Sequence, residues 1–392
     1  MPVGSAKNLL YGLALPILGK RCRWRNAVRY HGADRDLSQP IARVLKRHHV
    51  VGGCVQVFRN GQLAEGYTVG MARLTPDVPV SSDTYFRTAS IAKMACALLV
   101  MRLQTLGKLD VEEDISAVWG KLIRNPAHPD LPISLATLMS HTSGIVDSPR
   151  YFQSFQVPVR ASDLLTAPDT YASTKPGERF RYSNFAAGFI GCLLEQRFGQ
   201  SLESLMQQEL FTPLHAQATF DISTLGGAGI ASAYRVFPPM RSASFDAPAR
   251  FRSASPLDCA DPETHYQLAS GSLFITAEGL ARLCLPLITG GRSNEQQFLN
   301  GRCLTLMTTP TASWPEPQVR MRHGMGLLEI DDPAICSRRL HGHQGFAYGA
   351  VNGVFFDDNG NGFTSLNSGA SEKRIGHLSC LNRDLITVCM KG

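Results

Sequence analysis

A serine followed three residues later by a lysine is the feature of this chain that most directly suggests chemistry. Ser90 and Lys93 stand at the start of an apolar segment, from Ile91 to about Leu106, which predicts a helix. A spacing of three places both side chains on one helix face. A serine hydroxyl is a weak nucleophile, and a neutral lysine amine can take its proton. The pair therefore predicts a nucleophilic serine with its own base.

A second triplet, Tyr182-Ser183-Asn184, directly precedes a strongly apolar segment that predicts a helix. A tyrosine beside a lysine can hold or pass a proton, because the cation lowers the pKa of the phenol. An asparagine amide offers two donors and one acceptor, so it can hold a lysine and a substrate amide together. These residue types would complete a site around the serine.

The third triplet, His343-Gln344-Gly345, lies on a predicted strand and is followed by Phe346. A glycine in a strand allows the backbone to approach a ligand closely. The histidine could donate a hydrogen bond to the substrate or to the tyrosine.

The elements that must position these triplets alternate in type along the chain. Strand patterns occupy both ends, and helical patterns dominate the middle. Helices are expected over 37–50, 185–197 and 378–390, strands over 51–58, 63–69, 325–330, 339–342, 351–357 and 362–368, and a long loop over 226–264. If the terminal strands share one sheet, the middle of the chain lies beside that sheet as a helical unit.

Composition places the chain among ordinary globular proteins: it has 392 residues, 44% of them hydrophobic, and a net charge of +7. Six Lys and Arg residues precede the first acid, Asp34, and the remainder is nearly balanced. A clustered basic face with recognisable motifs is therefore missing, which argues against nucleic acid as a partner. None of the ten cysteines forms a C-x-x-C pair, and several lie in apolar runs. Buried free thiols favour a reducing compartment and predict a cytoplasmic protein.

The N-terminal segment leaves a second possibility for location open. Residues 9–18 are apolar and follow Lys7, like the core of a signal peptide, but no small-residue cleavage site follows. Ten apolar residues are too few to span a bilayer. A peripheral membrane contact through residues 1–30, or an exported form, remains an alternative to a segment that packs on the domain.

Taken in order, the three triplets resemble those of the serine β-lactamase and penicillin-binding-protein superfamily, whose motifs begin with S-x-x-K. The resemblance is to the branch that contains class C β-lactamases, D-Ala-D-Ala carboxypeptidases, D-aminopeptidases and esterases, where Y-x-N and K-T-G or H-x-G follow. Flanking segments agree, notably 83–87, 138–144, 175–177 and 270–273. The resemblance covers roughly residues 40–370.

The resemblance implies an α/β (α+β) fold in which an antiparallel sheet flanked by helices adjoins an all-helical subdomain. The expected division is a basic leader over 1–36 and a hydrolase domain over 37–392. Within the domain, the sheet subdomain would comprise about 37–85 and 270–392, and the helical subdomain about 108–270.

The resemblance also implies roles for the site residues. Ser90 would be the nucleophile, and Lys93 and Tyr182 would share general-base and general-acid work. Asn184 would position Lys93 and the substrate amide, and His343 and Gly345 would contact the substrate. Backbone N–H groups of Ser90 and Phe346 would form the oxyanion hole. Lys93 must act partly neutral, so its pKa would have to fall by roughly three units. No cofactor and no metal are implied.

His343 departs from the lysine that class C β-lactamases resembling this chain carry at that position. A histidine is mostly neutral at pH 7 and anchors a carboxylate weakly. The favoured hypothesis is therefore a D-amino-acid peptidase of the carboxypeptidase or aminopeptidase type, which forms an acyl-enzyme with a small peptide. The alternatives are an esterase or acyltransferase, a weak β-lactamase, and a catalytically silent scaffold.

Each motif also has a purely structural interpretation. Ser90 with Lys93, and Tyr182 with Asn184, could be helix caps. His341 and His343 could be an H-x-H metal pair, although no further ligand follows at metallohydrolase spacing. His141, in the H-T-S-G turn, is expected to be structural. There is no G-x-S-x-G, H-E-x-x-H or Walker A motif.

Overall fold

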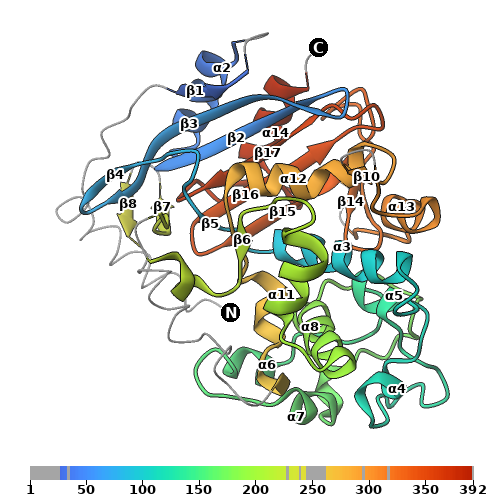
Figure 1. Ribbon diagram of the computed structural model, residues 1–392. Coiled ribbons are helices and arrows are strands. Elements are labelled where there is room, and N and C mark those ends of the chain that lie inside the picture. Colours follow the sequence, from blue (N-terminus) through green and yellow to red (C-terminus); the bar gives the residue numbers. More distant parts are fainter. Residues whose placement is uncertain are drawn as a thin grey trace.

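A ten-stranded antiparallel sheet joins the two ends of the chain in the computed structural model (Figure 1). The structure describes residues 27–32, 36–226, 229–237, 240–243, 262–293, 296–315 and 318–390. The sheet is continuous because β2 (Gly52–Arg59) pairs with β17 (Gly362–Asn367). The expectation that the terminal strands share one sheet is confirmed.

The strands follow one another across the sheet in an order that places the N-terminal hairpin at one side. From that side, the order is β1 (Val28–His31), β3 (Gln62–Leu74), β2, β17, β16 (Ala350–Phe356), β15 (Leu340–Ala347), β14 (Leu328–Ile330), β13 (Met321–His323) and β12 (Ala312–Ser313), and β4 (Asp77–Pro79) pairs with β3.

Helices cover both faces of the sheet. Its strands therefore carry apolar side chains on both sides. On β16, Val351 and Phe355 pack with α2 (Ser38–Arg47) and α14 (Cys380–Cys389). The alternate residues Val354 and Phe356 belong to the core on the opposite face, with α3 (Ile91–Thr105) and α12 (Ala277–Ile288). Side chains of a strand alternate between faces, which is why one strand contributes to two cores.

The middle of the chain is mainly helical and lies below the sheet in the view of Figure 1. Its helices are α4 (Ile115–Trp119), α5 (Leu135–Met139), α6 (Pro149–Gln153), α7 (Ala161–Leu165), α8 (Asn184–Phe198), α9 (Leu202–Met206) and α11 (Tyr266–Gly271); α13 (Gly301–Thr308) follows α12. Short 3-10 or π turns cover Pro168–Thr170, Gln207–Phe211, Ile222–Leu225 and Pro262–Thr264. Short strands complete the structure: β5 (Phe86–Arg87), β6 (Ala218–Thr219), β7 (Tyr234–Phe237), β8 (Met240–Ala243), β9 (Phe274–Ile275), β10 (Arg292–Ser293), β11 (Gln296–Gln297), β18 (Arg374–Ile375) and β19 (Leu378–Ser379).

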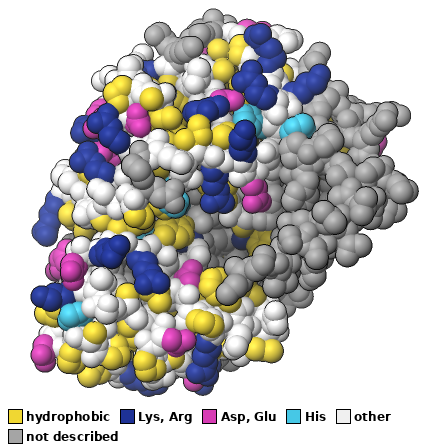
Figure 2. Space-filling model, turned by 180° about the vertical axis from the view of Figure 1, so that it is seen from behind, with side chains coloured by type: hydrophobic (Ala, Val, Ile, Leu, Met, Phe, Trp, Pro, Cys, Tyr) yellow, Lys and Arg dark blue, Asp and Glu magenta, His cyan; other side chains and the backbone are white. Residues whose placement is uncertain are grey.

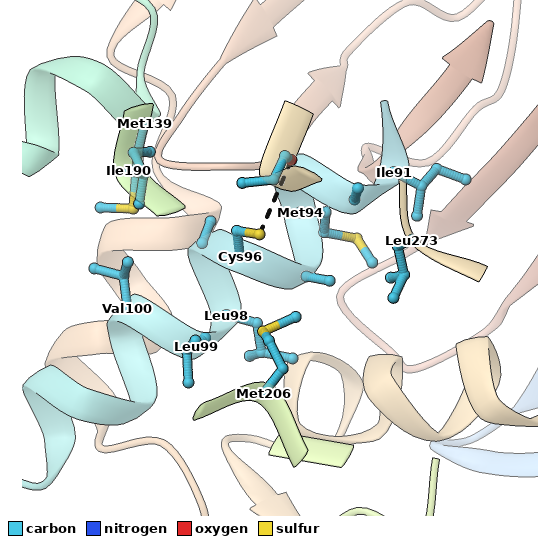
Figure 3. Close-up of a cluster of buried hydrophobic side chains, with 14 of the residues drawn as sticks. Ile91, Met94, Cys96, Leu98, Leu99, Val100, Met139, Ile190, Met206 and Leu273 are labelled. Atoms are coloured by element: carbon cyan, nitrogen blue, oxygen red, sulfur yellow. Dashed lines mark hydrogen bonds between the residues drawn. The ribbon is translucent and has the colours of Figure 1, made fainter. Parts of the chain in front are cut away.

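Helix α3 is buried along almost its whole length, because core side chains surround it. Figure 3 shows its apolar side chains packed among Met139, Ile190, Met206 and Leu273 from surrounding segments. The Cys96 thiol lies on this helix and contacts the carbonyl of Ala269 at 3.9 Å. A helix that is apolar all round is typical of a buried central element. Core side chains therefore hold this helix on all sides.

Most expected elements form, with differences at their ends. The helix expected over 185–197 is α8, which the Ser183 hydroxyl caps and which ends at Gly199, where φ is +62°. The helix expected over 378–390 begins only at 380, because 378–379 form a strand and Ser379 caps the helix. The loop expected over 226–264 contains the β7–β8 hairpin, and 244–261 lie outside the described residues.

The expected leader falls largely outside the described residues, which begin at 27. Its described part includes β1, which extends the sheet at the outer side of β3. On the face shown in Figure 2, Lys and Arg side chains are interspersed with acidic and apolar ones. None of the described helices combines the length and the apolar character needed to cross a bilayer. Of the eight cysteines in the described part of the chain, seven are buried.

Candidate active site

The three sequence triplets meet at the N-terminal end of α3. Lys93 Nζ lies 3.2 Å from Ser90 Oγ, 2.9 Å from Asn184 Oδ1 and 2.5 Å from the carbonyl oxygen of Ser270. The amine also lies 5.2 Å from the centre of the Tyr182 ring. Lys93 and Asn184, which are 91 positions apart in the chain, are therefore in direct contact, as the ordered motifs predict.

Lys93 is a buried amine whose direct partners are uncharged. Its side chain is 5% exposed, and burial lowers its pKa from 10.5 to about 7. The nearby Asp147 carboxylate opposes that shift and Arg87 adds to it. The requirement for a fall of roughly three units is thus met by desolvation, because a charged amine is costly in a low-dielectric site. At neutral pH, a large fraction of Lys93 is the free amine.

Tyr182 behaves differently from the sequence-based expectation. Burial raises the pKa of its phenol, Asp147 raises it further, and a hydrogen bond with Ser90 opposes the change. The net direction is therefore opposite to the lowering expected from the lysine, because burial and not the cation sets the pKa of this phenol. The ring is fixed between His141, at a centroid distance of 4.2 Å, and Trp314, at 5.9 Å. Tyr182 is therefore a protonated phenol at neutral pH.

Strand β15 passes close to the turn that carries the serine. A Cβ atom at Gly345 would lie 2.2 Å from the carbonyl oxygen of Thr88 and 3.2 Å from the backbone nitrogen of Ser90, so only glycine fits. Ala89 has a φ of +52°, a strained value for a residue with a side chain. The Phe346 ring is partly buried beneath the Arg374 guanidinium and packs against the core on the other face of the sheet. A contribution of Phe346 to the site would therefore come from its backbone.

His343 is buried, and its ring Nδ1 lies 2.9 Å from the carbonyl oxygen of Gln344. Because a carbonyl only accepts, Nδ1 carries the proton and Nε2 is an acceptor. Burial lowers the pKa of His343 to about 3, with further lowering by His323 and Lys93. The imidazole is therefore uncharged at neutral pH. This third motif presents no cation, as the sequence comparison with lysine-bearing relatives suggested.

Two residues at the site, Asp147 and His323, were not singled out in the sequence. The Asp147 carboxylate binds Asn184. The flanking segment 270–273 was noted in the sequence, but not that the carbonyl of Ser270 accepts from Lys93. His323, on the short strand β13, lies between His141 and His343, with ring centroids 5.0 and 6.1 Å away. Asp147 lies in an irregular segment and His323 on a three-residue strand, so neither belongs to a periodic or motif pattern in the sequence. His141 also has a positioning role: its Nδ1 accepts from the backbone N–H of Ser183 at 3.3 Å.

The described residues hold no group of three or more His, Cys, Asp or Glu side chains arranged for a metal ion. In the possible H-x-H pair, His341 is instead bonded to Asp358, at 3.0 Å from Nε2 to Oδ1. His343 points its Nδ1 proton at a backbone carbonyl. The two histidines are therefore each held by separate protein partners.

The chain is similar to known proteins in sequence and in fold. The Beta-lactamase family model matches residues 37–373. Penicillin-binding protein 4 of Amycolatopsis lactamdurans is 29% identical over 173 residues, 43% of this chain and 44% of that protein. Esterase EstB of Burkholderia gladioli is 25% identical over 187 residues, 43% of this chain and 47% of that protein. The matched stretches thus span less than half the length of these curated relatives.

Solved structures with the same fold cover nearly the whole chain. A penicillin-binding protein homologue from Pyrococcus abyssi superimposes with a TM-score of 0.71 at 19% identity, over 90% of this chain and 78% of that one. EstCE1, described as a hydrolase with promiscuous acyltransferase activity, gives 0.72 at 21% identity, over 89% and 98%. The chain therefore belongs to the Beta-lactamase family, whose model spans most of its length, and it shares its fold with these solved structures.

Proposed function

We propose that this protein hydrolyses small amides through an acyl-enzyme on Ser90, with Lys93 as the base. The observation that carries the proposal is the buried Lys93 amine, with a pKa of about 7, placed 3.2 Å from the serine hydroxyl. A general base works best when its pKa lies near the working pH. A surface lysine, with its ordinary pKa, would be charged and unable to accept the proton.

In the acylation step, Lys93 takes the proton of Ser90 while the Oγ atom bonds to the substrate carbonyl carbon. The negative charge on the carbonyl oxygen is received by the backbone N–H groups of Ser90 and Phe346. The carbon–nitrogen bond then breaks, and the leaving nitrogen receives a proton from Tyr182, which its raised pKa keeps protonated. The phenolate regains that proton from Lys93. Water then attacks the ester of Ser90 by the reverse proton path.

The substrate we favour is a D-amino-acid peptide or amide of the aminopeptidase type. A carboxypeptidase substrate bears a free carboxylate beside the scissile bond, and a cation would stabilise it there. His343 occupies the third motif as an uncharged imidazole with its Nε2 as an acceptor. An acceptor suits an N–H or ammonium group of the substrate better than a carboxylate. Similarity to penicillin-binding proteins supports peptide chemistry.

An esterase or acyltransferase is the second candidate. EstCE1 shares the fold over 98% of its own length, and EstB is among the curated relatives. Ester and amide cleavage use the same acyl-enzyme, and they differ in the need to protonate the leaving atom. Esters with good leaving groups need that proton less, so they depend less on Tyr182.

The test begins with a fluorophosphonate probe and intact-mass analysis of the wild type and Ser90→Ala. One adduct on the wild type and none on the variant would support Ser90 as the nucleophile. Turnover is then compared on matched pairs: a D-alanyl amide against the corresponding ester, and an acyl-D-Ala-D-Ala peptide with a free carboxylate against its carboxamide. Amide turnover with preference for the carboxamide supports the aminopeptidase type. Brisk ester turnover alone would move the assignment to an esterase, and an unlabelled, folded wild type would refute the proposal.

A further inference from the structure

Asp147 is a half-buried carboxylate that touches the site without touching Ser90. Its Oδ1 accepts from the Ser183 hydroxyl and from the backbone N–H of Phe185, each at 2.9 Å. Its Oδ2 accepts from Asn184 Nδ2 at 2.8 Å. The carboxylate thus binds three consecutive residues at the start of α8. A carboxylate is suited to this place, because it accepts at both oxygens and donates at neither.

This contact fixes which way the Asn184 amide faces. Since Nδ2 donates to Asp147, Oδ1 is the atom directed at Lys93 Nζ, 2.9 Å away. An asparagine amide can turn over to exchange its oxygen and nitrogen, and the surrounding hydrogen bonds decide between the two orientations. A partner that can only accept leaves one orientation. The acceptor end of Asn184 therefore always meets the amine.

The orientation matters because a neutral amine has two hydrogens and one lone pair. Two acceptors contact Lys93: Asn184 Oδ1 and the carbonyl oxygen of Ser270, at 2.9 and 2.5 Å. They take the two hydrogens of the free amine. The lone pair is then left for the third contact, the Ser90 hydroxyl at 3.2 Å. The arrangement of hydrogen bonds thus prepares Lys93 to accept the serine proton.

We infer that Asp147 is a positioning residue for the proposed base: by fixing the Asn184 amide, it directs the lone pair of Lys93 at Ser90. The inference rests on the proposed function, since it assigns a role within the same site. It extends that function by a residue which lies outside the three motifs and contacts neither the nucleophile nor the oxyanion donors.

The charge of Asp147 has a second effect on the same amine. Among the groups that act on Lys93, Asp147 raises its pKa against the effect of burial, as Cys96 also does, while Arg87 lowers it. The other titratable groups around Lys93 are buried rings. Burial and the charge of Lys93 lower the pKa values of His141, His323 and His343, and burial raises the pKa of Tyr182. Neutralising Asp147 should therefore lower the pKa of Lys93.

Asp147→Asn changes the charge and the hydrogen bonding of this residue without changing the size of its side chain. A change in activity then does not come from altered packing volume. If its oxygen stays with the two donors Ser183 and Phe185, its new NH2 group faces the NH2 group of Asn184. Two donors repel, so Asn184 must turn and present its NH2 group to Lys93. The lone pair of Lys93 is then drawn to Asn184 instead of Ser90. We expect kcat/KM to fall by about 10²-fold and its acid limb to move to lower pH.

Two controls distinguish positioning from stability. Ser183→Ala removes one hydrogen bond to the same carboxylate and the cap of α8, but leaves the Asn184 contact. It should lower the melting temperature with no shift of the acid limb. Asp163→Asn makes the same charge change at a half-exposed position of α7 and should alter neither the melting temperature nor the acid limb. An unmoved acid limb in Asp147→Asn would overturn the inference, even if activity and melting temperature both fell.

A substrate-free measurement keeps the inference testable by itself. Titration of 13Cε-lysine by NMR, with the Lys93 signal assigned by its loss in Lys93→Met, reports the pKa of the amine directly. A lower midpoint in Asp147→Asn than in the wild type supports the role, and an equal midpoint refutes it. If the wild type shows no reaction with the fluorophosphonate probe, the proposed function fails, while this titration still decides whether Asp147 controls the amine.

Discussion

The two ends of helix α8 each hold buried polar groups, and the two sites are built in opposite ways. Near its C-terminal end, Glu195 bonds His265 at 2.7 Å and accepts the backbone N–H of Leu202 at 2.7 Å. At its N-terminal end, Lys93 meets the amide of Asn184, a backbone carbonyl and a hydroxyl. Glu195, His265 and Lys93 are each at most 6% exposed.

The difference lies in how each buried group is compensated. A carboxylate bonded to an imidazole and a backbone N–H is satisfied within the protein, and it ties α8 to α9 and to the segment before α11. A buried amine with neutral partners has its pKa lowered to about 7, because nothing in contact fully offsets its charge. A compensated pair fixes structure, whereas an undercompensated amine is ready to exchange a proton.

Removing the nucleophile gives the largest expected effect. Ser90→Ala should reduce kcat/KM by at least about 10⁴-fold, because the covalent path through Ser90 is lost. The structure should persist, since the core around α3 consists of other residues. The measurement is hydrolysis of an activated ester together with thermal melting. Wild-type rates in this variant would overturn the assignment of the nucleophile.

The next largest effect is the pH dependence that the Lys93 amine gives to activity and stability. Its direction follows from the lowered pKa of this amine. The free amine is the active form, so kcat/KM of the wild type should rise with pH through about 7. The unfolded chain holds the lysine proton up to about pH 10.4, so the unfolded state binds more protons between pH 7 and 10.4. The free energy of unfolding therefore increases with pH in that window, by up to about 4–5 kcal/mol.

Lys93→Met should abolish both dependences. Denaturant unfolding at several pH values between 6 and 10 is the measurement, and the gain with pH should be absent in the variant. An identical pH dependence of stability in the wild type and Lys93→Met would show that the amine titrates normally in the folded protein.

Breaking the compensated pair should affect stability and leave the proton chemistry intact. Glu195→Ala leaves the His265 ring and the Leu202 N–H without their partner, and we expect a loss of about 3–5 kcal/mol in the free energy of unfolding. Chemical denaturation measures the loss, and the pH profile of kcat/KM under folding conditions is the companion readout. A shifted acid limb would contradict the separation between the two ends of α8.

The smallest effect on stability is expected at a half-exposed ion pair, which serves as the comparison for the buried Glu195–His265 pair. Glu278 and Arg282 on α12 form an ion pair at 2.7 Å with spacing i,i+4. Glu278→Gln should cost only about 0.3–0.5 kcal/mol, because water and salt screen such pairs. Urea unfolding at low and high salt measures it. If Glu278→Gln lowered the free energy of unfolding as much as Glu195→Ala, burial would not be what determines the contribution of these pairs to stability.

Much of the fold and of the site can be predicted from the sequence, where the signal is local. The apolar stretch after Ser90 forms α3, and Gly199 ends α8 where a left-handed residue is needed. The strands of the terminal quarter follow from short apolar runs between turn residues. The three triplets meet at one place, as their order in the chain predicts.

What the sequence by itself determined is therefore the set of reactive side chains and the elements that carry them. Only the tertiary structure decided their chemical state. The pKa of Lys93 depends on how much water the packed core excludes, and that of Tyr182 rose where a nearby cation alone would have lowered it. Asp147 and the Ser270 carbonyl became part of the site because folding brought them there. Desolvation and hydrogen-bond direction are properties of the surroundings, and the surroundings exist only once distant segments have packed together.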